Sequence, residues 1–142
     1  GMMDELIAFV RARLGEDEAA AAAASDGPWT AWRGQPGLGL RQLEYAVTLP
    51  GQNSGSFASI ATASWMDAEH IARHDPARVL REVEAKRAIL AQIAPWMDSA
   101  EDDHWYERGV GEQPPYEGSV LLMKLLAAVW GGHPDYRSEW KP

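Results

Sequence analysis

The spacing of apolar residues predicts a helix at the start of the chain. Between Asp4 and about Ala24, apolar side chains recur every three or four residues, as they do along one face of a helix; they are Leu6, Phe9, Val10 and Leu14. An alanine run with high helix propensity follows, and the segment "SDGP" then supplies a glycine and a proline that end the helix. We therefore expect one long N-terminal helix.

Between residues 29 and 65 the spacing falls to two, which is typical of β-strands. In "RQLEYAVTL", residues 41–49, the side chains of Leu43, Tyr45, Val47 and Leu49 share one face. Shorter segments at 29–33 and 57–65 flank this strand, separated from it by turns rich in Gly and Pro. Short connections favour antiparallel pairing, because parallel strands need a long crossover. The pattern predicts a three-stranded antiparallel sheet covered on one face by helices.

Helical spacing returns after Trp65 and predicts a broken pair of helices. The first covers residues 66–74, and the second begins after Asp75, a good capping residue, with Pro76 at its first position. Pro95 is expected to end the second helix near Ala94. Its apolar stripe consists of Val79, Leu80, Val83, Leu90 and Ile93.

Residues 118–130 predict a C-terminal helix that is apolar on most sides, and we therefore expect it at the centre of the core. The predicted fold class is α+β, with an N-terminal helix, a three-stranded antiparallel sheet, a broken central helix pair and this C-terminal helix. The length of 142 residues fits a single domain, residues 1–142, with a long loop at 96–118.

The charge and hydropathy of the chain disfavour two classes of partner. Thirteen basic residues against twenty-one acidic ones give a net charge of −8, which opposes attraction to nucleic-acid phosphates or anionic membranes. The longest apolar run, residues 120–130, contains Lys124 and is shorter than the ~20 residues that span a bilayer. The start, "GMMDELIAFV", lacks the basic region of a signal peptide. We expect a cytoplasmic protein without direct nucleic-acid or membrane binding.

Two histidines near the helix break admit two interpretations. The chain has no cysteine, so a metal would need His, Asp or Glu ligands. Asp67, His70 and His74 fall on one helical stripe and are candidate metal ligands. A zinc hydrolase would carry a glutamate after the first histidine, where this chain has Ile71. The simpler interpretation is a helix joint at which His74 and Asp75 satisfy backbone groups.

The remaining histidines carry weaker signals. His104 lies among Asp102, Asp103 and Glu107, which are competent metal ligands or acid–base groups, yet a solvated acidic loop explains them as well. His133 precedes Pro134 and is predicted to be a turn residue.

Seven tryptophans are a large number for this length. Trp29, Trp65 and Trp130 lie where predicted elements begin or end, and we expect them to pack at the corners of the core. A second set of aromatic residues lies in the predicted long loop and gives the candidates for a protein interface: Trp96, Trp105, Tyr106 and Tyr116.

Four segments carry a resemblance to a known family. "AEHIARHDPARVLREVEAKRAIL" at 68–90, "LIAFVRARLGEDEAAA" at 6–21, "GPW" at 27–29 and "HPDYRSEWKP" at 133–142 together resemble a family of small actinobacterial proteins of unknown function. More distantly, the chain is similar to small phage-encoded proteins with a Gly-Pro-Trp start. The resemblance implies the same layout and no catalytic residue. Relatives often carry Cys and His in the region that matches the loop at 96–118, and this chain lacks the Cys.

These observations favour a non-enzymatic accessory or protein-binding module of mobile-element origin, with a protein partner or self-association through helix packing or sheet edges. One alternative is a small metal-dependent or ligand-binding enzyme that uses His70, His74 and nearby acids; apart from that metal, no cofactor is expected. Another is an acidic nucleic-acid mimic, whose candidate carboxylates are Glu16, Asp17 and Glu18 with Glu101, Asp102 and Asp103.

Overall fold

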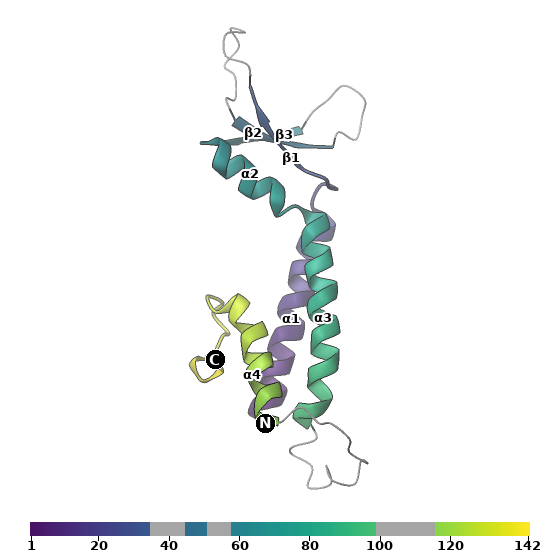
Figure 1. Cartoon of the computed structure of the whole chain (residues 1–142), viewed down its shortest axis with the longest axis vertical. Coiled ribbons are helices and arrows are strands. Elements are labelled where there is room, and N and C mark those ends of the chain that lie inside the picture. Colours follow the sequence, from purple (N-terminus) through teal and green to yellow (C-terminus); the bar gives the residue numbers. More distant parts are fainter. Residues whose placement is uncertain (35–44, 51–57, 99–115) are drawn as a thin grey trace. The chain divides into compact units, whose positions relative to one another are not determined.

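The computed structural model describes residues 1–34, 45–50, 58–98 and 116–142. The elements, labelled in Figure 1, are α1 (Met2–Ala23), β1 (Thr30–Arg33), β2 (Tyr45–Leu49), β3 (Ala58–Thr62), α2 (Trp65–Arg73), α3 (Pro76–Asp98) and α4 (Tyr116–Ala127), followed by the short 3-10 helices η2 (Ala128–Trp130) and η3 (Ser138–Trp140). This order confirms the predicted α+β class.

The chain forms two compact units. Residues 1–16 and 83–142 make up the helical unit, and residues 17–82 make up the sheet unit. Helices α1 and α3 are continuous and contribute residues to both units. The prediction of a single domain stays a prediction, because compactness alone does not say which parts fold independently.

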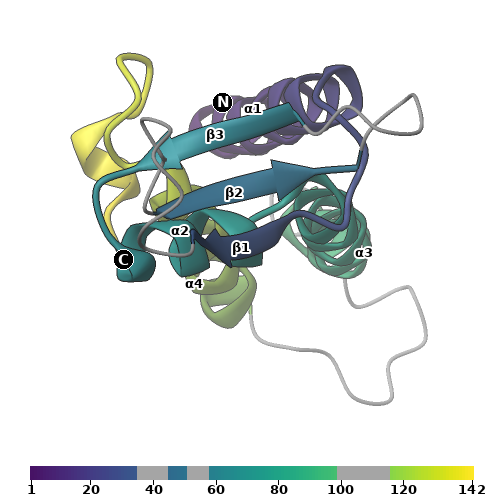
Figure 2. The same ribbon diagram turned by 90° about the horizontal axis from the view of Figure 1, so that it is seen from above.

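The sheet unit contains the predicted antiparallel meander. The strand order is β1-β2-β3, and Figure 2 shows the three strands side by side. Val47 in the central strand pairs with Ala31 on one side and Ile60 on the other. Val47 has no exposed surface, as expected for the apolar face of a half-buried strand.

Ala46 departs from the predicted alternation. It lies on the opposite face from Val47, yet only 1% of its surface is exposed. The register places Trp32 directly across from it, and directly opposed residues of an antiparallel pair share a face. A large indole beside a methyl group explains this burial, which the period alone did not indicate.

Helix α2 packs against the sheet, with contacts to all three strands. Its N-terminus is capped by Ser64, whose Oγ accepts the backbone N–H of Asp67 at 3.1 Å. The guanidinium of Arg33 lies 5.7 Å from the Tyr45 ring centre and 5.5 Å from that of Trp65. These cation–π contacts connect the sheet to the start of the helix.

The break between α2 and α3 lies at the predicted place, but α3 does not end at Ala94. It continues through Pro95 to Asp98. A proline inside a helix costs about 3 kcal/mol, because it lacks an N–H and crowds the preceding turn. Burial of Ala94 and Met97, on either side of an exposed Pro95, offsets that cost. Helices α3 and α4 therefore include residues 96–98 and 116–118 of the predicted loop, and residues 99–115 lie outside the described residues.

The core of the helical unit lies between α1, α3 and α4 (Figure 1). The predicted stripe of α1 is confirmed, since Leu6, Val10 and Leu14 are completely buried. On α3, Val83, Leu90 and Ile93 are buried as predicted, but Leu80 is 38% exposed. The buried positions from Val83 onward belong to the helical unit, whereas α2, in the sheet unit, packs on the strands.

The C-terminal segment packs against α1. Phe9 is its anchor, because the rings of His133, Tyr136 and Trp140 lie 5.7, 5.9 and 5.0 Å from the Phe9 ring centre. Trp140 is 2% exposed. The "HPDYRSEW" segment thus contributes an aromatic cluster to the core of the helical unit.

Candidate functional site

The joint between α2 and α3 is organised by the buried carboxylate of Asp75. Its Oδ1 accepts the backbone N–H of Arg78 at 2.9 Å and caps α3. Its Oδ2 accepts the backbone N–H of Trp29 at 3.2 Å. One side chain therefore begins a helix and also fixes the segment that leads into β1.

Gly27 is required for this arrangement. A Cβ added at Gly27 would lie 2.6 Å from Asp75 Oδ2 and 3.3 Å from the Cβ of Ala77. The Gly27–Pro28 peptide bond is cis, and Trp29 follows it. The "GPW" and "HDPAR" segments, which are far apart in the sequence, are thus two sides of one contact. The helix-joint interpretation of this region is confirmed.

His70 and His74 lie side by side at the end of α2. Their ring centres are 4.3 Å apart, both side chains are exposed, and His74 is the C-cap residue of the helix. The Nδ1 of His74 lies 2.7 Å from the carbonyl oxygen of His70. The structure therefore shows His74 bonded to a backbone carbonyl group, as the helix-joint interpretation predicted. It also places the two imidazole rings close enough to bind one ligand.

Asp67 does not complete this pair. In the described part of the chain, no three His, Asp or Glu side chains come together in a way that could hold a metal ion. The backbone N–H of Asp67 belongs to the Ser64 cap, at the beginning of α2. The predicted set of three metal ligands is therefore not found among the described residues, but the pair of His70 and His74 is.

A small hollow of about 230 Å³ adjoins His74 within the sheet unit. The alanine-rich end of α1 forms one wall, and Trp29, Pro76 and Val79 form others; Asp17 is a second titratable group in the lining. This hollow is smaller than the ~300–1,000 Å³ of typical ligand pockets. The small alanine side chains at this end of α1 leave room for it.

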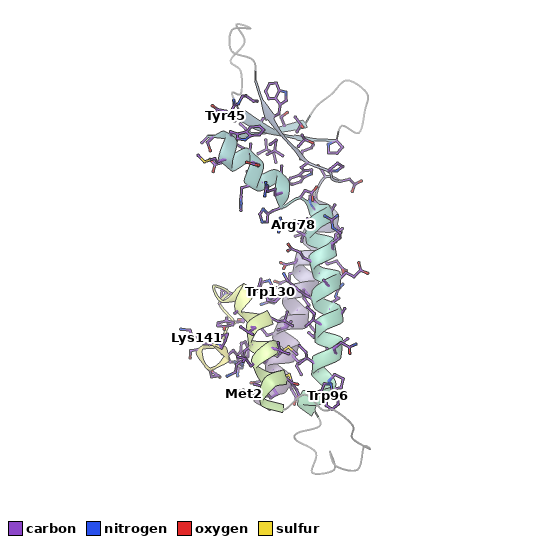
Figure 3. The ribbon with its side chains drawn as sticks, viewed as in Figure 1. Met2, Tyr45, Arg78, Trp96, Trp130 and Lys141 are labelled. Carbon is purple, nitrogen blue, oxygen red and sulfur yellow. The ribbon has the colours of Figure 1, made fainter. Side chains whose placement is uncertain are left out.

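Several predicted site residues lie elsewhere or outside the described residues. Asp102, Asp103, His104, Trp105, Tyr106 and Glu107 lie in 99–115. Trp96 is half-buried near the end of α3, and Tyr116 begins α4. Figure 3 shows Trp96 at the end of α3 and Trp130 at the end of α4. Trp29, Trp65 and Trp130 are half-buried, and the most deeply buried tryptophan among the described residues is Trp140.

Arg13 is a structurally important residue that the sequence did not indicate. It is 9% exposed, donates to Glu16 at 2.7 Å and contacts the His133 ring nitrogens at 2.7 and 2.9 Å. Its guanidinium also lies 5.2 Å from the Phe9 ring centre. His133 is a turn residue, as predicted, but it has this additional role of holding the C-terminal segment against α1. Nothing in the local pattern distinguishes Arg13 from the exposed Arg11.

Helix α4 corrects the expectation of a helix at the centre of the core. Its buried positions form one narrow stripe, Ser119, Met123 and Ala127. The opposite side of α4 and the following helix η2 carry large apolar side chains that are 48–57% exposed. We call this set the α4 face: Leu121, Leu122 and Leu125 of α4 and Val129 of η2. The sequence was misleading because a helix that is apolar all round is normally buried.

The charge and hydropathy of the described residues add two points. Glu16, in the first predicted carboxylate cluster, is paired with Arg13, and the second cluster, residues 101–103, lies outside the described residues. None of the described helices combines the length and the apolar composition needed to cross a membrane.

Comparison with known proteins identifies the family but no function. No curated protein and no solved structure matches this chain. The model of a family of unknown function, DUF6221, matches residues 3–142, which includes the "GPW" contact, the histidine pair, α4 and the C-terminal segment. The chain belongs to this uncharacterised domain family, DUF6221.

Proposed function

We propose that the protein is a non-enzymatic binding module whose α4 face docks an amphipathic helix of a partner protein. The observation that carries this proposal is the exposure of Leu121, Leu122 and Leu125 on α4 and of Val129 in η2. Isolated surface leucines need no explanation, but three leucines on one side of α4, followed by an exposed valine in η2, form an apolar patch.

The spacing within the α4 face fits a helical partner. Leu122, Leu125 and Val129 are separated by three and then four residues, the spacing at which apolar side chains of one helix meet another helix. Leu121 lies one turn before Leu125 and widens the stripe. Recognition of an amphipathic helix through anchors at such positions is a recurrent binding mode.

The area of the α4 face favours a transient contact. Side chains that are about half exposed leave on the order of 350 Å² of apolar surface, within the ~300–600 Å² of the largest patch on a typical monomer. A partner helix of matching size would bring the buried total to roughly 700 Å², below the ~1,200–2,000 Å² of stable interfaces. We therefore expect micromolar affinity for a helix and no obligate dimer. We also propose an accessory role of mobile-element origin, which the Gly-Pro-Trp start at 27–29 suggested from the sequence.

The test is site-specific photo-crosslinking in the native host. A photoreactive amino acid replaces Leu125 in one variant and Ala12, an exposed residue of α1, in a matched control. We expect the Leu125 probe, and not the Ala12 probe, to trap one protein through a segment with apolar residues three and four apart. With that protein purified, Leu125→Asp should weaken binding at least about tenfold, and Ala12→Asp less than twofold.

Folding of each variant is checked by circular dichroism, and both substituted positions are exposed. Equal crosslinking from the two positions would contradict the proposal. So would a concentration-dependent dimer in sedimentation velocity that Leu125→Asp abolishes, because the occupant of the α4 face would then be a second copy of this chain.

A further inference from the structure

We infer that His70 and His74 form a surface chelating site for a late first-row transition-metal ion, with Cu²⁺ bound more tightly than Ni²⁺ or Zn²⁺. The site belongs to the sheet unit and uses no residue of the α4 face, so the two proposals stand or fall separately. It contains two protein ligands, and water completes the coordination.

The geometry brings two nitrogen donors together. The histidines are four residues apart, at the end of α2, and their ring centres are separated by 4.3 Å with an angle of 40° between the ring planes. Side chains at this spacing are neighbours on a helix surface, and two histidines in this relation supply zinc ligands in helical metal motifs. Both rings are exposed, so an ion reaches them without opening the fold.

The hydrogen bond of His74 fixes which nitrogen is available. The His70 carbonyl oxygen, 2.7 Å from Nδ1 of His74, only accepts hydrogen bonds, so Nδ1 carries the proton. In a neutral imidazole the lone pair is then on Nε2. Metal-ligating histidines are commonly oriented by donating their other ring N–H to a carbonyl or carboxylate. His74 is therefore positioned as a ligand before any metal arrives.

The surroundings of the pair tolerate a cation. In the described part of the chain, the ring of His70 makes no hydrogen bond that would occupy its nitrogens, and its aromatic contact is with His74. The nearest basic side chain along the helix, Arg73, is paired with Glu69 at 3.2 Å, which offsets its charge. Ser64 holds the other end of α2 in place.

The donor set determines the class of metal. Imidazole nitrogens suit Cu²⁺, Ni²⁺ and Zn²⁺, whereas Mg²⁺ and Ca²⁺ prefer oxygen ligands. For a flexible site of two nitrogens and water, affinity follows the Irving–Williams order and is highest for Cu²⁺.

The test measures binding of each metal alone to the full chain by isothermal titration calorimetry, together with electron paramagnetic resonance of the Cu²⁺ complex. The variants are His70→Gln and His74→Gln. A matched control, His74→Gln with Glu69→His, keeps the number of histidines but places two of them at adjacent positions, which do not face each other on a helix. Circular dichroism checks that α2 and the sheet are retained in each variant.

We expect one Cu²⁺ site with two coordinated imidazole nitrogens in the natural chain. Each single substitution, and the matched control, should weaken it at least about tenfold, because chelation makes the second bond intramolecular. The ion should also raise the melting temperature of the natural chain and not that of the variants. Affinity unchanged by either substitution, or sensitivity to only one histidine, would overturn the inference, as would tighter binding of Zn²⁺ than of Cu²⁺.

Discussion

Removing the Asp75 carboxylate tests the account of the helix joint most directly. Asp75 is 8% exposed and accepts two backbone N–H groups, that of Arg78 at 2.9 Å and that of Trp29 at 3.2 Å. In Asp75→Ala both donors lose their partner, so the cap of α3 and the anchor of the "GPW" segment disappear together.

The expected loss is about 2–3 kcal/mol for the sheet unit. Losing an N-cap costs about 1 kcal/mol, within a range of about 0.5–2. Leaving a buried N–H unsatisfied costs about 1–3 kcal/mol, and the lower end applies to Trp29 because its half-buried position admits water. Asp75→Asn separates the two contributions, since its single oxygen can accept from only one of the donors. We expect about half of the loss in Asp75→Asn.

The assay is amide hydrogen exchange at Trp29 and Arg78, because a chain of two compact units need not unfold in one two-state transition. A loss of about 2 kcal/mol corresponds to roughly 30-fold faster exchange. The amide of Met97, in the helical unit, is the internal control. Equal effects of Ala and Asn, or changes below about 0.5 kcal/mol in both, would refute the two-acceptor role of Asp75.

Gly27→Ala completes a double-mutant cycle with Asp75→Ala. The new Cβ would meet Asp75 Oδ2 at 2.6 Å, so the substitution should cost about 1–3 kcal/mol in the natural chain. Without the carboxylate the principal clash is gone, and the cost of Gly27→Ala should fall measurably. Additive effects of the two substitutions would show that the close approach is not what requires glycine here.

Three further predictions concern the other anchors of the fold. Ser64→Ala removes the cap of α2 and should cost about 1 kcal/mol, seen as faster exchange of the Asp67 amide; unchanged exchange would contradict the role of the Ser64 hydroxyl. Trp140→Ala should lower the free energy of unfolding of the helical unit, measured with denaturant, by about 3–5 kcal/mol, because the indole is 2% exposed and contacts Phe9. A decrease below about 1 kcal/mol would mean that the C-terminal segment does not contribute to the core. Arg13→Met should change the free energy of unfolding by less than about 1 kcal/mol, because Met keeps an apolar stem over Phe9 and removes a buried Nε that has no hydrogen-bond partner among the described residues. Arg13→Ala, which also loses the stem, should be about 2 kcal/mol less stable than Arg13→Met. Equal losses in the two variants would show that the charge and not the packing matters.

The sequence predicted the elements because local patterns carry their own physical signal. Apolar residues every three to four positions can share a face only in a helix, and alternating residues can do so only in a strand, so α1, the three strands and the break at Asp75 and Pro76 were all located correctly. The helix-joint role of Asp75 was equally local, since aspartate is favoured as an N-cap and proline at the first position of a helix.

The candidate sites depended on contacts between distant segments. The spacing of His70 and His74 suggested proximity, but only the fold showed that His74 donates to a backbone carbonyl and that Asp67 does not join the pair. Of the aromatic residues predicted to form an interface, Trp105 and Tyr106 lie outside the described residues, whereas Trp96 and Tyr116 belong to α3 and α4. The α4 face, by contrast, was overlooked because its leucines were assigned to the core.

By itself, the sequence determined the order and type of the elements and excluded cysteine chemistry, because these follow from composition and from spacings within a few residues. Only the tertiary structure decided which apolar side chains are buried. Burial depends on what packs opposite each helix face, so Arg13 became a core residue beneath the C-terminal segment while Leu121, Leu122 and Leu125 remained on the surface. The role of the "GPW" segment likewise became visible only in the fold, which places Gly27 against Asp75, 48 positions away in the chain.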